Sequence, residues 1–273
     1  MDWRRRRLEK MSVVILQDEI VHYEVLGRGK PLIFLHGWVG SWRYWISAMQ
    51  AASISYRAYA LDLWGFGDSA KSPRLYTLDQ QVNLLESFLE EMGIRKVALI
   101  GHGLGAIVAL LYAQRSQQLV DRVMAIGLPN GQHAINPRLY TATSQELVDW
   151  LLSRAADSEA VRQEAPKVDQ RAVYTSLADL QQLDFSETSQ KLNTPCLLVY
   201  GQNDPVVEET PAPTQSATLP EHIHQIVFEQ SGHFPMLDEP SKFNRLTADF
   251  LSLSSGISPR QLQLKEEWKR RVR

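Results

Sequence analysis

Four short segments of the sequence combine histidine or aspartate, which transfer protons, with glycines, which allow tight turns. They are His36-Gly37-Trp38, Gly101-His102-Gly103-Leu104-Gly105, Gly201-Gln202-Asn203-Asp204 and Ser231-Gly232-His233. Each segment comes at the end of an apolar run of strand length, so we expect each at the carboxyl end of a strand. In open α/β sheets, ligands bind outside these strand ends.

The strands that must position these segments are apolar runs with many β-branched residues. We predict strands over residues 12–19, 20–27, 31–37, 56–65, 96–103, 120–127, 196–204 and 223–230. Helical spacing of apolar residues predicts helices over 42–52, 77–91, 104–114 and 241–253, with Pro240 as a favourable start for the last. Several strands are almost continuously apolar, as strands buried on both faces are. The predicted fold class is α/β, with a mostly parallel central sheet and helices on both faces.

The alternation of strand and helix stops between residues 131 and 192, where the sequence is helical and rich in charge. We interpret this insertion as a small helical cap over the carboxyl end of the sheet. The predicted organisation is a basic N-terminal extension (1–11), a core in two parts (12–130 and 193–255), the cap (131–192), and a basic amphipathic C-terminal helix (256–273).

The predicted C-terminal helix starts at Ser258 and Pro259 and carries Leu264, Trp268 and Val272 at intervals of four residues. We expect this apolar stripe to dock on the body of the protein or to stay solvated. A contact of residues 258–273 with a partner or with another copy of the chain is the less favoured alternative.

Composition excludes several classes of protein. One cysteine in 273 residues rules out an intramolecular disulfide framework and a cysteine-based zinc site, and it fits a reducing compartment. A net charge of −2 provides no global field that would recruit nucleic acid. Residues 97–114 are uncharged, but their glycines and His102 suit a strand, a turn and a helix better than a transmembrane span. With no signal-peptide pattern, we predict a cytoplasmic location, and we predict no metal or cofactor.

In this order and at these strand ends, the four segments resemble the α/β-hydrolase superfamily, together with DLWGFGDSAK at 62–71. The resemblance spans about residues 20–253, and the chain is similar to small-cap members that act on esters, lactones or related apolar substrates. In that family a strained turn between strand and helix exposes its middle residue, the nucleophile. Gly101 and Gly105 flank the turn as the pattern requires, because side chains there would clash with backbone. The middle residue is Gly103, where the family has Ser, or Asp or Cys in some branches.

The resemblance also implies roles for other residues. Asp204 matches the family's acid, and His233, 29 residues later, matches the base that the acid orients. The backbone N–H groups of Trp38 and Leu104 match the oxyanion hole, which does not depend on side chains. Trp38 is also the aromatic residue best placed to line a pocket for a small apolar ligand beneath the cap.

Glycine has no nucleophilic atom, so no acyl-enzyme can form at Gly103, and we expect little or no covalent ester hydrolysis. Cys196, His102 and Ser231 are poor substitutes, since we expect a core residue, a packing residue and a turn residue at these positions. The resemblance places His36 and His102 beside the substrate pocket. A dehalogenase is disfavoured, because Leu104 stands where that branch has a halide-binding tryptophan.

Three hypotheses remain open from the sequence. The first is a non-catalytic binding or regulatory protein. The second is an enzyme, a hydrolase or lyase, in which His233 and Asp204 activate water or remove a substrate proton without a covalent intermediate. The third is an active serine hydrolase in which Gly103 was introduced by engineering. Retention of both Asp204 and His233 favours the second and third, because a binding protein needs no general base.

Overall fold

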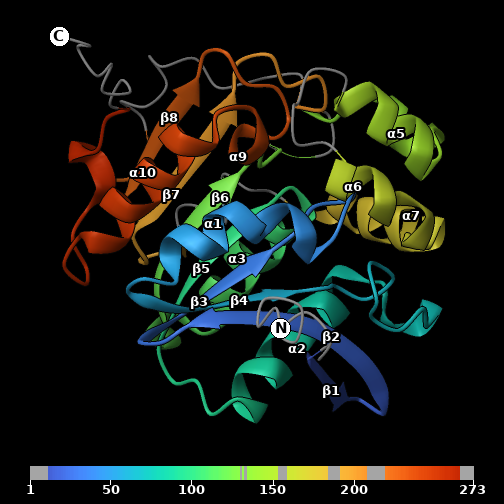
Figure 1. Ribbon diagram of the computed structural model, residues 1–273, viewed down its shortest axis with the longest axis horizontal. Coiled ribbons are helices and arrows are strands. Elements are labelled where there is room, and N and C mark those ends of the chain that lie inside the picture. Colours follow the sequence, from blue (N-terminus) through green and yellow to red (C-terminus); the bar gives the residue numbers. More distant parts are fainter. Residues whose placement is uncertain are drawn as a thin grey trace, which may run out of the picture.

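The central element of the fold is an eight-stranded sheet with the order β1-β2-β4-β3-β5-β6-β7-β8 (Figure 1). The computed structural model describes residues 12–129, 131, 134–152, 159–183, 191–207 and 219–264. The strands are Ser12–Leu16 (β1), Glu19–Gly27 (β2), Lys30–Leu35 (β3), Tyr56–Leu61 (β4), Val97–His102 (β5), Val120–Ile126 (β6), Cys196–Gly201 (β7) and Ile223–Phe228 (β8). β2 pairs antiparallel with β1 and β4, and all pairs from β4 to β8 are parallel. The predicted mostly parallel sheet is confirmed.

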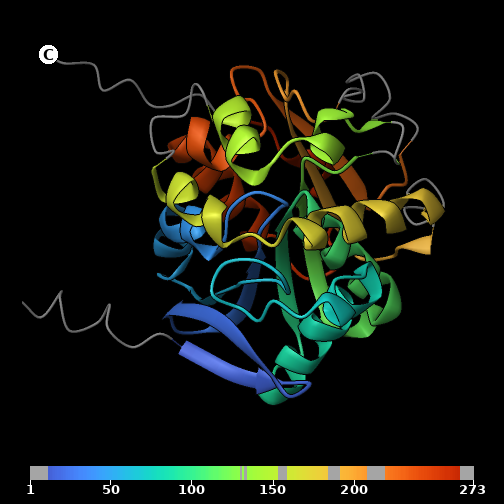
Figure 2. The same ribbon diagram turned by 90° about the vertical axis from the view of Figure 1, so that its right-hand side faces the viewer.

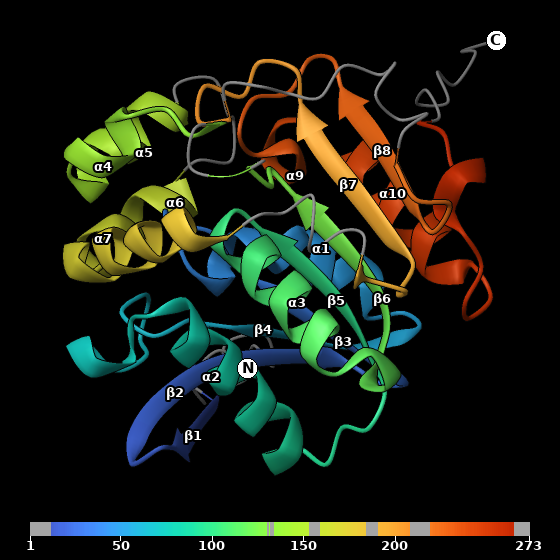
Figure 3. The same ribbon diagram turned by 180° about the vertical axis from the view of Figure 1, so that it is seen from behind.

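Helices cover both faces of this sheet, as predicted. α1 (Ile46–Ala52) and α10 (Pro240–Ser252) pack against each other on the face toward the viewer in Figure 1. α2 (Leu78–Glu91) and α3 (Leu104–Arg115) pack together on the opposite face, which Figure 3 shows from behind. A short helix, α9 (Pro235–Asp238), leads directly into α10. This arrangement explains the near-continuous apolar runs of the central strands, because both faces are buried.

The chain between β6 and β7 forms a group of short helices that we call the cap. They are α4 (Arg138–Thr141), α5 (Ser144–Leu151), α6 (Glu159–Glu164) and α7 (Gln170–Asp179). These helices lie beyond one end of the sheet in Figure 1 and run across the front of the molecule in Figure 2. They fall within the predicted insertion of residues 131–192, and α6 contacts the 3₁₀ turn Trp42–Trp45 that precedes α1.

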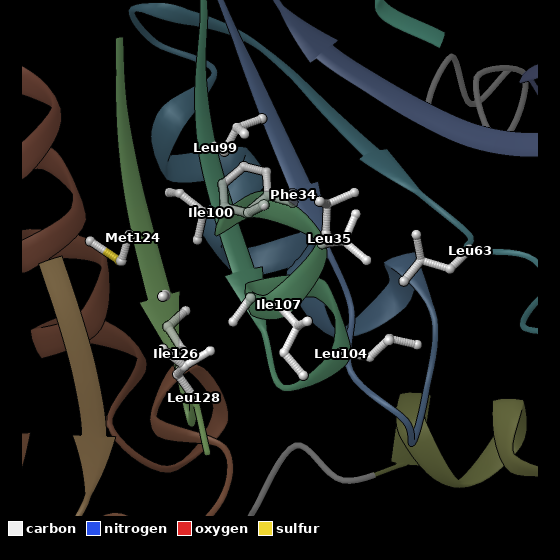
Figure 4. Close-up of a cluster of buried hydrophobic side chains, with 14 of the residues drawn as sticks. Phe34, Leu35, Leu63, Leu99, Ile100, Leu104, Ile107, Met124, Ile126 and Leu128 are labelled. Atoms are coloured by element: carbon white, nitrogen blue, oxygen red, sulfur yellow. The ribbon is translucent and has the colours of Figure 1, made fainter. Parts of the chain in front are cut away.

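The most deeply buried helix supports the predicted glycine-rich turn. α3 begins at Leu104, directly after the turn, and Leu104 and Ile107 are wholly buried among side chains of β3, β5 and β6 (Figure 4). Burying one such side chain contributes about 2 kcal/mol. The first turn of α3 is therefore held by core packing from both sides.

Several observed elements are shorter than the predicted ones. β4 ends at Leu61 rather than at residue 65, and β7 ends at Gly201 rather than at residue 204. The final residues of these runs leave the sheet and form loops, because their polar side chains bond to other loops. Residues 42–45 form a 3₁₀ turn in place of the start of an α-helix. At the start of α2, Thr77 caps the helix by accepting the N–H of Gln80 at 3.3 Å.

The predicted C-terminal helix has a different beginning in the structure. In the described residues, Pro259–Gln261 form a 3₁₀ turn that Ser258 caps by accepting the N–H of Arg260, and no α-helix follows through residue 264. The turn ends because Leu262 is extended and its carbonyl accepts a hydrogen bond from the His224 ring. Trp268 and Val272 lie outside the described residues, and so does the basic extension 1–11.

No helix among the described residues has the length and apolar character needed to cross a membrane.

Candidate active site

The glycine-rich turn has the geometry of a nucleophile elbow. Gly103 links β5 directly to α3 with φ +50° and ψ −111°, a conformation that L-residues rarely adopt. A Cβ at Gly101 would collide with the carbonyl oxygen of Gly105, and a Cβ at Gly105 would collide with that of Leu35. The flanking glycines are therefore required by close backbone approach, as the sequence predicted.

The two predicted proton-transfer side chains meet at the same end of the sheet. His233, in the loop after β8, donates from Nδ1 to Asp204 Oδ2 at 2.9 Å and lies 3.0 Å from Oδ1. The Asp204 carboxylate also accepts the N–H of Val206 at 2.8 Å, which fixes its orientation. Both side chains are buried, with 1% of Asp204 and 3% of His233 exposed. An imidazole that carries its single proton on Nδ1 has its lone pair on Nε2, the arrangement of a general base.

Two backbone N–H groups beside the elbow are unoccupied by protein acceptors. Trp38 lies in the loop after β3 and Leu104 is the first residue of α3; within the described part of the chain, neither N–H has an acceptor. The two segments lie side by side, since Gly105 N–H donates to the His36 carbonyl at 3.0 Å. Whether both donors reach one ligand oxygen, as an oxyanion hole requires, stays a prediction.

The indole of Trp38 lies next to the elbow tip. A Cβ at Gly103 would be 3.2 Å from Trp38 Cε3, closer than most real Cβ contacts. The indole Nε1 donates to Ser176 Oγ of α7 at 3.0 Å, and only 2% of the residue is exposed. The Trp38 side chain therefore joins the elbow to the cap, a contact that the sequence did not predict.

Both ring nitrogens of each predicted pocket histidine are bonded to protein groups. His36 donates from Nδ1 to the Gly37 carbonyl at 2.8 Å and accepts the Leu63 N–H at Nε2, 2.9 Å away. His102 donates from Nε2 to the His233 carbonyl at 2.8 Å, and its Nδ1 accepts from Tyr44, as described next. Both rings are completely buried. The two rings join neighbouring loops by providing hydrogen-bond partners for buried backbone groups of Gly37, Leu63 and His233.

Tyr44 is a site residue that the sequence did not reveal. Its hydroxyl accepts the N–H of Gly37 at 2.5 Å and donates to His102 Nδ1 at 3.1 Å. His102 in turn bonds to the backbone carbonyl of His233, and the centroids of the two rings are 4.4 Å apart. Burial and the nearby His233 hold the pKa of His102 well below its usual value, so His102 is neutral. A tyrosine in an aromatic-rich segment gives no signal that distinguishes this role from core packing.

A set of ion pairs fastens the cap to loops of the core beside the site. Glu164, at the end of α6, accepts from Arg43 Nε at 2.7 Å and from Lys167 Nζ at 3.1 Å. Lys167 also pairs with Asp68 in the loop after β4, at 2.9 Å. The Glu164 side chain is 98% buried, whereas Arg43 and Lys167 are 37% and 34% exposed. The sequence showed only a charge-rich segment here, without the partners.

The other candidate nucleophiles are placed as the sequence suggested. Cys196 starts β7 inside the core, and burial raises the pKa of its thiol to about 12, so it is not a thiolate at neutral pH. Ser231 donates its hydroxyl proton to Glu239 Oε2 at 2.7 Å, away from His233 Nδ1 and its Asp204 partner. Neither side chain is arranged as an activated nucleophile.

One cluster has metal-ligand residue types, but its members are bonded to protein groups. Ligand atoms of His22, Asp62 and Asp68 lie within 4.8 Å of one another. His22 Nδ1 donates to Asp62 Oδ2 at 2.8 Å, and Asp62 also accepts the N–H groups of Trp42 and Asp68 at 2.9 and 3.0 Å. The cluster is a buried network that joins the loops after β3 and β4, and we assign it no metal.

The family profile described as "Alpha/beta hydrolase family" matches residues 32–246, so this chain belongs to that family. A relative, the pimeloyl-[acyl-carrier protein] methyl ester esterase of Vibrio parahaemolyticus serotype O3:K6, is 25% identical over 254 residues, or 84% of this chain and 97% of that protein. The relatives of this chain thus include esterases.

Solved structures show the same fold. The N-acyl homoserine lactonase AidH, as a serine-to-glycine mutant complexed with N-hexanoyl homoserine lactone, has a TM-score of 0.78 and 18% identity, covering 89% of this chain and 97% of its own. E-2-(acetamidomethylene)succinate hydrolase has a TM-score of 0.76 and 18% identity, covering 89% and 99%. At this identity the likeness concerns the fold.

Proposed function

We propose that this protein binds a small ester- or lactone-type carbonyl compound beneath the cap and hydrolyses it without a covalent intermediate. The observation that carries the proposal is the complete Asp204–His233 pair at an elbow whose tip, Gly103, has no nucleophilic atom. A buried carboxylate that fixes the proton on His233 Nδ1 is of use to a general base and not to a passive wall of a pocket. The esterase relatives supply the substrate class.

The proposed reaction uses water as the nucleophile. His233 Nε2 takes a proton from a water molecule as the oxygen attacks the substrate carbonyl carbon, and Asp204 stabilises the resulting imidazolium. The negative carbonyl oxygen accepts hydrogen bonds from the N–H groups of Trp38 and Leu104. When the tetrahedral intermediate collapses, the C–O bond to the alkoxide breaks and the alkoxide takes the proton from His233. Ester and water are thereby converted to acid and alcohol.

A second candidate, a binding protein without turnover, is favoured by one specific observation. The Trp38 indole lies against the elbow tip and bonds to Ser176 of the cap, while Trp38 and His233 are only 2% and 3% exposed. In this closed arrangement a ligand reaches the pair only if Trp38 or the cap moves.

The test is hydrolysis of a panel of short-chain esters and N-acyl lactones by the wild-type chain and by His233→Gln. We expect slow turnover without a burst and without labelling by serine-directed phosphonates, and a loss of roughly 10²–10⁴-fold in His233→Gln. His224→Gln is the matched control, because His224 lies on β8 and bonds to Leu262, away from the site. A burst or a covalent adduct would contradict the non-covalent mechanism, and binding without any turnover would support the second candidate instead.

Gly103→Ser tests whether the rest of a serine hydrolase is present. A hydroxyl at the tip gains a base in His233, so we expect phosphonate labelling and faster ester turnover, both lost when His233→Ala is added. Trp38 must yield by a few tenths of an ångström to admit the new Cβ. We therefore expect a larger gain in Gly103→Ser/Trp38→Leu. A folded double variant without labelling would show that the oxyanion donors or His233 are misplaced.

A further inference from the structure

A large cavity lies at the amino ends of the central strands, at the end of the sheet opposite to the elbow. Its volume is about 940 Å³, and it is lined where β3, β5 and β6 begin and by the facing sides of α1 and α10. Gly103 and Asp204 follow the carboxyl ends of their strands, whereas this cavity lies at the amino ends. It therefore belongs to neither the elbow nor the cap.

Small side chains explain why this space is hollow. Five alanines line it, from α1, β5 and α10: Ala48, Ala51, Ala52, Ala98 and Ala248. Larger residues at these positions would fill the space between the helices and the strand ends, as side chains fill most of a protein interior. Leu251 and Val97 add to this apolar part of the lining, and polar side chains such as Asn244 and Ser252 line the rest. The volume is within the range of small-molecule sites, roughly 300–1,000 Å³.

Two lysines line this cavity at the starts of neighbouring strands. Lys30 is the first residue of β3, Lys96 directly precedes β5, and β3 pairs with β5 in parallel. Like charges on neighbouring strands repel each other unless an anion lies between them. Lys96 donates to the carbonyl of Gln118, and within the described part of the chain neither lysine forms an ion pair.

The remaining charges of the cavity are already neutralised by one another. Arg122, which is buried, donates to the carbonyls of Phe250 and Leu253 at 2.6 and 2.7 Å and to Asp121 at 2.7 Å. Asp121 also accepts the hydroxyl of Ser255. Arg122 thus satisfies the exposed carbonyls at the end of α10, and Asp121 is occupied by Arg122. With Arg122 and Asp121 paired, the lining keeps a net positive charge from the two lysines, and the charge of Lys96 also acts on Asp121.

From this combination we propose that the cavity is a second binding site, which takes an amphipathic carboxylate such as a medium-chain fatty acid. The apolar chain lies among the alanines and Leu251, and the carboxylate lies between Lys30 and Lys96 with charge-assisted hydrogen bonds to both. The site does not depend on the function proposed for the elbow.

The experiment is calorimetric titration of the full chain with dodecanoate below its micelle concentration, and with dodecanol as the uncharged comparison. We expect one dodecanoate site, with affinity roughly tenfold or more lower for dodecanol and for Lys30→Gln/Lys96→Gln. Arg95→Gln is the matched control, because it removes one positive charge from the exposed residue next to Lys96 without touching the cavity. We expect it to bind like the wild type.

A space-filling variant separates this site from the elbow. Ala248→Trp places a ring in the cavity from an exposed position on α10, so the fold should persist, as circular dichroism and the melting temperature will show. We expect it to abolish dodecanoate binding. Equal binding by wild type, the lysine double variant and Ala248→Trp would place the ligand elsewhere and overturn the proposal, as would the absence of any binding.

Discussion

At the scale of single residues, Gly103 retains the elbow while removing its reactive atom. With φ +50° and ψ −111°, a residue with a Cβ is strained by about 1–3 kcal/mol, a cost that glycine avoids. The Trp38 ring packs directly against Gly103: a Cβ added at Gly103 would lie 3.2 Å from Trp38 Cε3. Glycine and tryptophan are therefore complementary at this site. The Asp204–His233 pair beside them keeps the geometry of a general base.

We expect the Tyr44 hydroxyl to stabilise this site through its hydrogen bonds to Gly37 and His102. Tyr44→Phe leaves the Gly37 N–H and His102 Nδ1 buried without partners, and each such loss costs about 1–3 kcal/mol. We expect a loss of about 2 kcal/mol or more in the free energy of unfolding in urea. ¹⁵N NMR of the histidine rings should show a changed tautomer or pKa for His102.

The matched control for this prediction is Tyr59→Phe, whose ring packs against Phe88 in the core and whose hydroxyl has no hydrogen bond recorded in the described residues. We expect its unfolding free energy to stay within about 0.5 kcal/mol of the wild type. Equal stability of both variants, with unchanged His102 signals, would show that the Tyr44 hydroxyl does not position the site.

At the scale of elements, the cap is attached to the core by a few long-range contacts beside the site. Glu164 of α6 pairs with Arg43, Lys167 pairs with Asp68, and Ser176 of α7 accepts the Trp38 indole N–H. Asp169 and Asp179, at the two ends of α7, also accept hydrogen bonds from the core. The strength of these contacts influences how readily α6 and α7 separate from the loops around the elbow.

Glu164→Gln should loosen the cap selectively. The change removes the charge that pairs with Arg43 and Lys167, and because Arg43 is 37% exposed we expect only about 1 kcal/mol of lost stability. Hydrogen exchange followed by mass spectrometry should show faster exchange in α6 and α7, with β5 unchanged. Glu159→Gln is the control, because Glu159 is exposed on the same helix and accepts only from Gln163 in the described structure. Uniform acceleration across core and cap, or none, would contradict this role.

At the scale of the whole molecule, the two ends of the parallel strands hold different kinds of site. The carboxyl ends of the strands carry the elbow and the Asp204–His233 pair, and the amino ends carry the alanine-lined cavity. Near the carboxyl ends of the strands, His22 on β2 and Asp62 after β4 form a second buried histidine–aspartate pair. It joins the antiparallel part of the sheet to the loops that surround the elbow.

The His22–Asp62 pair predicts a pH dependence of stability. Burial lowers the pKa of His22, but the hydrogen bond and charge of Asp62 outweigh it and raise this pKa; burial raises the pKa of Asp62, but His22 and neighbouring groups lower it. The histidine's contribution is complete below its unfolded pKa of about 6.5 and is lost as pH rises through its folded pKa. The aspartate's contribution is present above about 3.9 and is lost as pH falls further.

The contribution of the pair is therefore greatest between these two values. His22→Gln should lower the free energy of unfolding by about 3 kcal/mol at about pH 5.5 and by less at about pH 8.5. Urea denaturation at both values measures the difference, and His224→Gln serves as the control, since burial lowers the pKa of His224. A deficit that is the same at both pH values would show that His22 acts by packing alone.

The order of elements could be read from the sequence because the periodicity of apolar residues is a local property. Continuous apolar runs such as 97–102 are compatible with strands buried on both faces, and the glycines around residue 103 permit one kind of turn. The Asp204–His233 contact was also foreseeable, since parallel strands bring their carboxyl ends together. The ends of strands were less accurate, because the same residues suit a strand or a loop until their polar partners are known.

Tertiary structure alone decided what the buried polar side chains contact. The hydroxyl of Tyr44 meets a ring 58 positions away, Glu164 meets an arginine 121 positions away, and His102 meets the carbonyl of a residue 131 positions away. Such pairings depend on the closing of loops in three dimensions, and no local pattern of residue types encodes them. For the same reason the sequence did not indicate which groups the rings of His36 and His102 bond to. The sequence determined that an elbow without a nucleophile exists, and the fold determined that Trp38, Tyr44 and the cap enclose it.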